Sequence, residues 1–391
     1  MSLRLKDVCG YCDPAFEKVK LAFVDNFLMN KETGAAFALD LAGETVVDIW
    51  AGHRDFRRNR PWEKNTLANL YSATKGVTAL CALRLADQGL LDLDAPVNHY
   101  WPEFRRAGKA NITVRMLLNH TAAMVGIKRR LPLKSLYDWD MVTAALADQS
   151  PWWRPGEKHG YHAVTFGWLV GQVIRGITGR TVGQYLKQEI ADPLGLDLHI
   201  GLDPAEHSRS ATMIMLRVPT LHGDVGRFTE AIIKNPFGPT ASAFGNPLSI
   251  ITGVNTDAWR SAEIPAANGQ GTARSLARLY GVLANGGKRG DTVILSQSMV
   301  NQCSKEEVSG LDAVLQLPTR FSLGFMLNQD NPSGNFGPGE KSFGHPGAGG
   351  CLGFADPDHK LGFGYTVNKM DTYILIDPRA KRIIDAVYAC L

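Results

Sequence analysis

Hydrophobic residues near the start of the chain recur first at helical spacing and then in short runs typical of strands. The segment Pro14–Asn30 is predicted to form an amphipathic helix, stopped by Gly34. Its apolar face carries Phe16, Val19, Phe23 and Phe27. The runs Ala35–Leu41 and Thr45–Ala51 follow, separated by Ala-Gly-Glu, and they predict an antiparallel hairpin.

The middle of the chain, from Pro96 to about Gly287, has a mainly helical pattern with long connections. Helices are predicted at Val114–Asn119, Trp139–Ala147, Thr165–Ile177, Val182–Ile190 and Thr272–Leu283. The stretch His199–Ile264 is rich in Gly, Pro and Thr and has weak periodicity, so we expect loops and short helices there.

The C-terminal part returns to a strand pattern. Strands are predicted at Phe321–Met326, Cys351–Ala355 and Leu361–Val367, and a closing helix at Pro378–Leu391. Strands at both ends around a helical middle indicate an α+β fold, with one antiparallel sheet built from both termini and flanked by helices. The predicted division is residues 1–70 and 288–391 for the sheet domain and 71–287 for an inserted, mainly helical domain. The active site would lie between them.

Composition and charge narrow the class of protein. With 45% apolar and 20% charged residues, the 391-residue chain is composed like an ordinary globular protein. A net charge of +4 without a long Lys/Arg run argues against a nucleic-acid partner. The N-terminus lacks the apolar run of a signal peptide, and no stretch approaches the length of a membrane span. We therefore expect a cytoplasmic protein without a membrane partner, whose oligomeric state the sequence leaves open.

The cysteines and histidines do not form a recognisable metal site. Of six cysteines, only Cys9 and Cys12 have Cys-x-x-Cys spacing, and no second pair completes a zinc site. The set is typical of reduced thiols in a reducing compartment. His159 and His162 are three residues apart but lack a His-Glu-x-x-His motif. We expect neither a metal nor another cofactor.

The stretch Leu70–Asp94 carries the first candidate for catalytic chemistry. It begins with the one Ser-x-x-Lys pair of the chain, Ser72 and Lys75, and continues with an apolar helical pattern. Residues i and i+3 share one face of a helix, so the hydroxyl and the amine would be neighbours. Unpaired N–H groups at a helix start suit a developing oxyanion. By itself the spacing does not distinguish a catalytic pair from a chance match in which Ser72 is only the N-cap of a helix.

Two further places bear on a site. Tyr161 follows an Arg-Pro-Gly turn shortly before a predicted helix, and Gly344–Gly350 is a glycine-rich lead into a strand, where a backbone can approach a ligand closely. Trp152 and Trp153 are candidates for lining a substrate pocket, with core packing as the simpler alternative. His120 is expected to make structural hydrogen bonds behind the site.

In this order and spacing, the motifs resemble those of the serine β-lactamase and penicillin-binding-protein superfamily, and most closely those of the family VIII carboxylesterases. The resemblance implies that Ser72 is acylated and that Lys75 and Tyr161 activate it. It also implies an oxyanion hole made by the backbone N–H groups of Ser72 and Ala348. His345 and Gly347 are then candidates for the substrate pocket.

Two departures from the superfamily pattern favour an ester over a β-lactam. The Asn of Tyr-x-Asn is Ala163 here, and Lys-Thr-Gly is replaced by His345-Pro346-Gly347. In β-lactamases those residues hold an amide and a carboxylate, whereas family VIII esterases commonly diverge in the third motif. The expected function is a serine hydrolase that cleaves small carboxylic esters, with short acyl chains, through an acyl-serine intermediate.

Other functions stay open at this point: a β-lactamase, D,D-peptidase or other amide hydrolase, an acyltransferase, and a non-catalytic penicillin-recognising module. No serine lies in a Gly-x-Ser-x-Gly motif, which excludes the α/β-hydrolase esterases. Lysine and tyrosine are both protonated at neutral pH unless perturbed. The sequence therefore does not decide whether Lys75 or Tyr161 takes the proton of Ser72.

Overall fold

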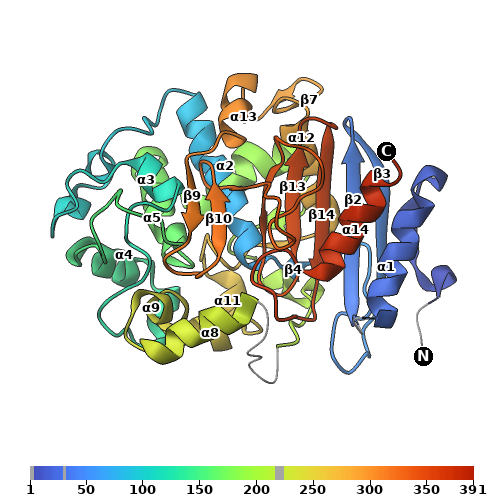
Figure 1. The fold of residues 1–391 in the computed structure, drawn as a ribbon, viewed down its shortest axis with the longest axis horizontal. Helices are drawn as coiled ribbons and strands as arrows, with labels where there is room; N and C mark the ends of the chain where they lie inside the picture. The colour runs from blue at the N-terminus through green and yellow to red at the C-terminus, as the bar shows by residue number, and fades with distance from the viewer. Residues whose placement is uncertain (1–3, 30–31, 216–223) are drawn as a thin grey trace.

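A nine-stranded antiparallel sheet organises the fold. The protein is described by a computed structural model covering residues 4–29, 32–215 and 224–391. Among these residues the strand order of the large sheet is β1-β3-β2-β14-β13-β12-β11-β10-β9 (Figure 1). The strands are β1 Cys9–Cys12, β2 Gly34–Leu41, β3 Glu44–Gly52, β9 Val308–Leu311, β10 Pro318–Phe321, β11 Met326–Leu327, β12 Phe343–Pro346, β13 Leu352–Asp356 and β14 Leu361–Val367.

The large sheet joins the two ends of the chain, as the α+β prediction requires. β14 pairs with β2 over its whole length, from Leu361 opposite Leu41 to Val367 opposite Ala35. Strand β14 contains two glycines, and helix α12 (Ala273–Ala284) packs directly on them. A Cβ added at Gly362 would lie 2.2 Å from the Ala277 carbonyl oxygen, so no larger residue fits there.

Helices cover both faces of this sheet. α12 lies behind β13, β14 and β2, whereas α1 (Glu17–Met29) and α14 (Pro378–Tyr388) lie on the opposite face (Figure 1). The core between them contains stacked aromatic rings, including Phe354 and Phe363 with ring centres 4.8 Å apart. Aromatic pairs of this kind contribute about 0.5–1.5 kcal/mol beyond the area they bury.

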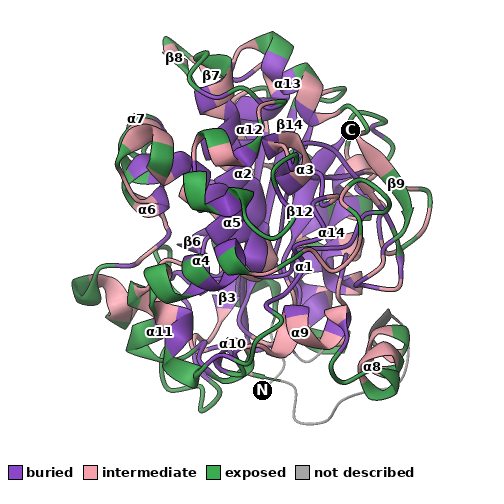
Figure 2. Ribbon diagram, turned by 90° about the vertical axis from the view of Figure 1, so that its left-hand side faces the viewer, coloured by how far each residue is buried: buried purple, intermediate pink, exposed green. Residues whose placement is uncertain are grey.

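The remaining helices lie beside the sheet, around the central helix α2 (Thr74–Asp87). α2 is buried along nearly its whole length, because it packs against α5, α6 and β12 (Figure 2). The others are α3 Val114–Leu118, α4 Trp139–Asp148, α5 Thr165–Thr178, α6 Val182–Leu186, α7 Asp192–Leu194, α8 Asp224–Lys234, α9 Pro239–Gly245, α10 Ser249–Thr252, α11 Asp257–Ser261 and α13 Gln297–Cys303. Two small sheets complete the described chain, β4 (Ala68–Asn69) with β6 (Gln270–Gly271) and β5 (Leu198–His199), and β7 (Lys288–Arg289) with β8 (Thr292–Val293).

Most predicted elements are confirmed within a few residues, and one strand is wrong. The predicted strand Phe321–Met326 is two strands, β10 and β11, joined by a tight turn. Gly324 has a φ of +86° there, and the Ser322 N–H donates to the Phe325 carbonyl oxygen at 2.9 Å. The alternating apolar pattern mimics a strand, but a glycine in the left-handed region reverses the chain.

Two other expectations have a mixed outcome. His199–Ile264 does consist of loops and short helices where it is described, and its residues 216–223 lie outside the described residues. The glycine-rich stretch starts inside strand β12 rather than in a loop before β13. The division into residues 1–70 with 288–391 and residues 71–287 stays a prediction.

Candidate active site

Ser72 stands at the entrance to the central helix. It lies in the one-turn 3-10 helix Tyr71–Ala73, which runs directly into α2. The N-cap residues of these two helices are Leu70 and Ala73, and neither cap uses a side-chain hydrogen bond. Ser72 is therefore not a helix cap. The preceding residue, Tyr71, has a φ of +45°, a conformation that costs a non-glycine residue about 1–3 kcal/mol.

Lys75 is completely buried one turn after Ser72. Its Nζ lies 3.2 Å from Ser72 Oγ and donates to the backbone carbonyls of Ala163 at 2.6 Å and Ala266 at 2.9 Å. Burial lowers the pKa of Lys75 well below its usual value. In its neutral form the amine has two N–H groups for the two carbonyls, and its lone pair is then left for the serine hydroxyl.

Tyr161 completes a group of three side chains around this hydroxyl. Its side chain lies close enough to that of Ser72 for the serine to influence the pKa of the phenol, and its ring centre lies 4.7 Å from Lys75 Nζ. Burial raises the pKa of the Tyr161 phenol far above its ordinary value, although the Ser72 side chain acts in the opposite direction. Tyr161 therefore keeps its proton at neutral pH. The structure brings together the three residues singled out in the sequence.

Two buried polar side chains accept hydrogen bonds from the backbone N–H groups of Tyr161 and of the next residue. Asp312 Oδ1 accepts the Tyr161 N–H at 3.1 Å, and His120 Nδ1 accepts the His162 N–H at 3.2 Å. Burial lowers the pKa of His120 well below its ordinary value and that of His162 to about 3, so both rings are neutral. His120 thus has the structural role expected of it. Asp312 was not anticipated, since nothing near it in sequence signals the contact.

The turn between β12 and β13 lies directly against the segment that leads to Ser72. A Cβ added at Gly347 would lie 2.2 Å from the Leu70 carbonyl oxygen, so only glycine allows this approach. The Gly347 N–H donates to the Cys351 carbonyl at 2.6 Å and closes the turn, which leaves Ala348 at its tip. Among the described residues, no backbone carbonyl accepts a hydrogen bond from the N–H of Ser72 or from the N–H of Ala348. That the two N–H groups form an oxyanion hole stays a prediction.

His345 lies in β12 beside Tyr161, with ring centres 6.0 Å apart. Its Nδ1–H donates to the Pro346 carbonyl at 2.7 Å, whereas Nε2 is buried without a partner in the described chain. Burial, together with the nearby Lys75, lowers the pKa of His345 to about 3. The ring is a neutral imidazole that presents a lone pair to the interior.

A buried neutral histidine makes the protein sensitive to acid. The unfolded chain binds a proton at His345 below about pH 6.5, but the folded chain does so only near pH 3, so the free energy of unfolding falls as the pH drops. Between pH 7 and 5 we expect the wild type to lose about 2 kcal/mol more than the His345→Asn variant. Urea unfolding at the two pH values measures this difference. Parallel losses in both proteins would contradict a neutral buried His345.

Trp152 and Trp153 are half-buried, and their ring N–H groups donate to the carbonyls of Gly126 at 2.8 Å and Lys158 at 3.1 Å. The Trp153 ring packs on Gly160, where an added Cβ would meet it at 2.7 Å. Trp153 therefore packs against the residue that directly precedes Tyr161. Contact of either tryptophan with substrate stays a prediction.

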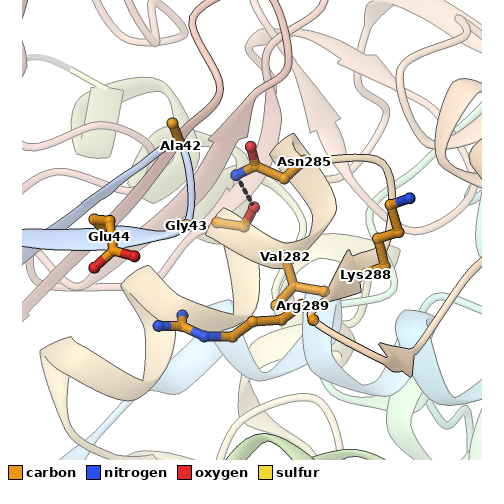
Figure 3. A pocket seen from close by; sticks show the side chains of 9 residues that line it. Ala42, Gly43, Glu44, Val282, Asn285, Lys288 and Arg289 are labelled. Carbon is orange, nitrogen blue, oxygen red and sulfur yellow. Dashed lines mark hydrogen bonds between the residues drawn. The ribbon is translucent and has the colours of Figure 1, made fainter.

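A separate hollow of about 520 Å³ lies away from these residues. It is bounded by the β2–β3 turn, the end of α12 and residues 288–290 (Figure 3). Arg289 on its rim pairs with the buried carboxylate of Asp40 at 3.1 Å. None of the candidate active-site residues lines this hollow.

The fold and this arrangement are those of a serine hydrolase with a Ser-x-x-Lys pair. A family model described as beta-lactamase matches residues 23–386, so the chain belongs to the β-lactamase family.

Named relatives and solved structures agree with this membership. The chain is 36% identical to the esterase/beta-lactamase LipL of Mycobacterium tuberculosis, over 93% of this chain and 83% of that one. It is similar to the crystal structure of a family VIII carboxylesterase, with 43% identity, a TM-score of 0.89 and coverage of 98% and 100%. A penicillin-binding protein homologue from Caulobacter crescentus has 38% identity, a TM-score of 0.91 and the same coverage.

The described residues contain neither a membrane-spanning helix nor a cluster of metal ligands. Within them, no helix is both long and apolar enough to cross a membrane. No group of three or more His, Cys, Asp or Glu residues in the same part of the chain could hold a metal ion.

Proposed function

We propose that the protein hydrolyses small carboxylic esters through an acyl-enzyme formed on Ser72. Its named relatives support ester cleavage, since they include an esterase/beta-lactamase and a family VIII carboxylesterase that align over nearly the whole chain. The observation that carries the catalytic assignment is the contact of the Ser72 hydroxyl with a buried lysine at 3.2 Å and with a buried tyrosine. A serine hydroxyl is a poor nucleophile without such an adjacent base.

In the first half of the reaction, Lys75 is the base. Its lowered pKa leaves it neutral, so it can take the proton of Ser72 as Oγ attacks the ester carbonyl. The N–H groups of Ser72 and Ala348 stabilise the resulting oxyanion, and each such donor contributes roughly 3 kcal/mol. Tyr161, which keeps its proton, donates it to the departing alkoxide, and the proton on Lys75 then returns to Tyr161. The alcohol leaves and the acyl-serine remains.

In the second half, water replaces the alcohol. The neutral Lys75 takes a proton from the attacking water, and the tetrahedral intermediate collapses with return of that proton to Ser72 Oγ. The carboxylic acid leaves, and the enzyme is restored. An alcohol in place of water would give transesterification by the same steps, which keeps acyltransferase activity as the second candidate.

The residues around Tyr161 and β12 favour an ester over an amide. Ala163 presents no side-chain amide to substrate, and its carbonyl oxygen is occupied by Lys75. His345 replaces the lysine of the β-lactamase third motif and is a neutral ring, so it offers no cation to a substrate carboxylate. An alkoxide also needs less help to depart than an amine, and this suits a site without those groups.

A substrate panel tests the proposal. Purified protein is assayed with p-nitrophenyl esters of increasing acyl length and with nitrocefin, and intact mass is recorded during turnover. We expect turnover of the shorter esters, nitrocefin hydrolysis that is slower by orders of magnitude, and a transient acyl adduct. Nitrocefin turnover comparable to ester turnover would make the protein a β-lactamase instead. A permanent adduct without product release would make it a penicillin-recognising module.

Removal of the Tyr161 hydroxyl tests its role as the acid separately from the role of Lys75 as the base. We expect Tyr161→Phe to lower kcat at least about a hundredfold, because the leaving alkoxide then lacks its proton donor. The loss should shrink with better leaving groups, so p-nitrophenyl and simple ethyl esters of the same acid are compared. A loss below tenfold for the ethyl ester would remove Tyr161 from the mechanism.

A further inference from the structure

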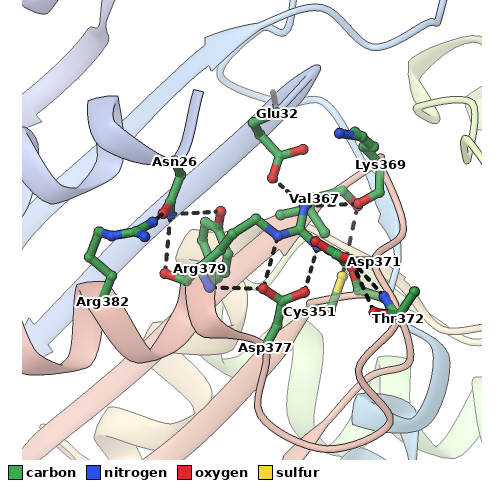
Figure 4. Close-up of polar contacts among 12 residues, drawn as sticks. Asn26, Glu32, Cys351, Val367, Lys369, Asp371, Thr372, Asp377, Arg379 and Arg382 are labelled. Atoms are coloured by element: carbon green, nitrogen blue, oxygen red, sulfur yellow. Dashed lines mark hydrogen bonds and ion pairs between the residues drawn. The ribbon is translucent and has the colours of Figure 1, made fainter. Parts of the chain in front are cut away.

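A buried arginine, Arg379, lies at the base of the turn that carries Ala348. It comes from the first turn of α14, and its side chain is 1% exposed. Figure 4 shows its guanidinium among Glu32, Asp377 and the backbone of Lys369. All five of its N–H groups are used, as burial of a charged side chain requires.

The hydrogen bonds of Arg379 reach the N-cap of its own helix and three other segments of the chain. The two carboxylate oxygens of Asp377 accept from Nε at 3.0 Å and from Nη2 at 2.7 Å. Glu32 accepts from Nη1. The Lys369 carbonyl accepts from Nη1 at 2.9 Å. The fifth N–H, on Nη2, donates to the carbonyl of Gly349 at 2.6 Å. Gly349 directly follows Ala348.

The turn is built largely of glycine, so side chains restrain its backbone little. Gly349 and Gly350 have φ angles of +84° and +125°, in a region that L side chains avoid, and glycine there has wide conformational freedom. Two backbone hydrogen bonds close the turn, from the Gly347 N–H to the Cys351 carbonyl and from the Gly350 N–H to the Gly347 carbonyl at 3.1 Å. Arg379 supplies the hydrogen bond to a further carbonyl of the turn, that of Gly349. A Cβ added at Gly350 would lie 2.6 Å from Nη2, so the guanidinium packs directly on the turn.

A contribution to folding stability does not account for the buried charges of this cluster. Burying one cation with two carboxylates is costly, and apolar residues of similar volume often do as well. Burial raises the pKa of Glu32 against the opposing effect of Arg379, which is the signature of that cost. What apolar residues could not supply is a planar, bidentate fork that aims one N–H at a backbone carbonyl.

We propose that Arg379 is a positioning residue for the oxyanion hole. Held in a fixed orientation by Asp377 and Glu32, it fixes the Gly349 carbonyl and thereby the direction of the Ala348 N–H. This inference rests on the proposed function, since it takes Ala348 as an oxyanion donor. A donor displaced by a fraction of an ångström loses much of its effect on the transition state but little on ground-state binding.

The test is Arg379→Lys, which keeps a cation between the two carboxylates but cannot form the fork. We expect kcat on a p-nitrophenyl ester to fall about 10–100-fold with KM changed less than threefold. The inhibition constant of a trifluoromethyl ketone, which forms a tetrahedral oxyanion adduct, should rise by a similar factor. Arg289→Lys is the matched control, because Arg289 pairs with another buried carboxylate, Asp40, at the separate hollow (Figure 3). We expect that variant to keep both constants within twofold.

Two further measurements keep the proposal falsifiable. If Arg379→Lys does not fold, by circular dichroism, Asp377→Asn takes its place: asparagine still caps α14, but its amide nitrogen cannot accept from the fork. The same kcat-selective loss is expected. Unchanged kcat and ketone inhibition in the folded variant, with Ser72→Ala inactive, would overturn the role of Arg379 alone. An active Ser72→Ala would overturn the proposed function itself.

Discussion

Replacement of Ser72 by alanine is expected to lower kcat for a p-nitrophenyl ester by at least about 10⁴-fold. The acyl-enzyme cannot form without Oγ, and any residual rate would come from the oxyanion donors and substrate binding alone. Because Ser72 caps no helix, its loss should change the free energy of unfolding little. Initial rates and thermal unfolding, measured on the same preparation, separate the two effects.

Ser135 supplies the control for this substitution. It also lies in a short 3-10 helix, Leu133–Tyr137, and its hydroxyl donates to the Pro132 carbonyl at 2.6 Å. Ser135→Ala should therefore lower stability by about 1 kcal/mol and leave kcat unchanged. Intact mass after rapid quenching should find the acyl adduct in this variant and none in Ser72→Ala. A Ser72→Ala protein within tenfold of the wild-type rate would exclude Ser72 as the nucleophile.

Substitution of Lys75 by arginine should cost about 10³-fold or more in kcat/KM at every pH. A guanidinium stays protonated even when buried, so it cannot accept the serine proton. In the wild type, burial lowers the pKa of Lys75, and the base is active when deprotonated. The rate should therefore rise with pH and reach its plateau well below pH 10.5, the ordinary value for lysine. The variant should have no such rising limb.

Lys109 is the matched lysine. It is also buried, its Nζ donates to the carbonyls of Arg106 and Ala147 at 2.8 Å, and burial lowers its pKa to about 8. Its hydrogen-bond partners in the described chain are backbone carbonyls, so Lys109→Arg should affect folding without removing the pH dependence of kcat/KM. Substantial activity in Lys75→Arg, or a wild-type profile that rises only above pH 10, would move the base role away from Lys75.

The elements and residues predictable from sequence were those with a local signal. The helix after Ser72 and strand β14 follow from periodicity, and Ser72 with Lys75 follow from their i, i+3 spacing at a helix start. The pattern did not predict the turn at Gly324, because apolar residues alternate on both sides of it as they would in an unbroken strand.

Residues that act through distant contacts had no such signal. Asp312 reaches the backbone of Tyr161 across 151 positions, and Arg379 reaches Gly349 and Glu32 from the last helix. A lone aspartate or arginine in a sequence is predicted to lie on the solvated surface, where these residues are usually found. The identity of the base likewise depends on burial of Lys75 and Tyr161, which spacing alone does not reveal.

The pairing of β2 with β14 has a consequence for synthesis of the protein. One edge of β2 pairs at once with β3, but on the other edge Leu41 pairs with Leu361. The ribosome therefore adds about 320 residues before that edge meets β14. During that interval β2, whose Ala-Ala-Phe-Ala-Leu segment is mostly buried in the finished sheet, presents an unpaired apolar edge to the cell. Nascent chains of this protein should depend on a chaperone until β14 emerges, and a chain stopped before β14 should aggregate rather than fold.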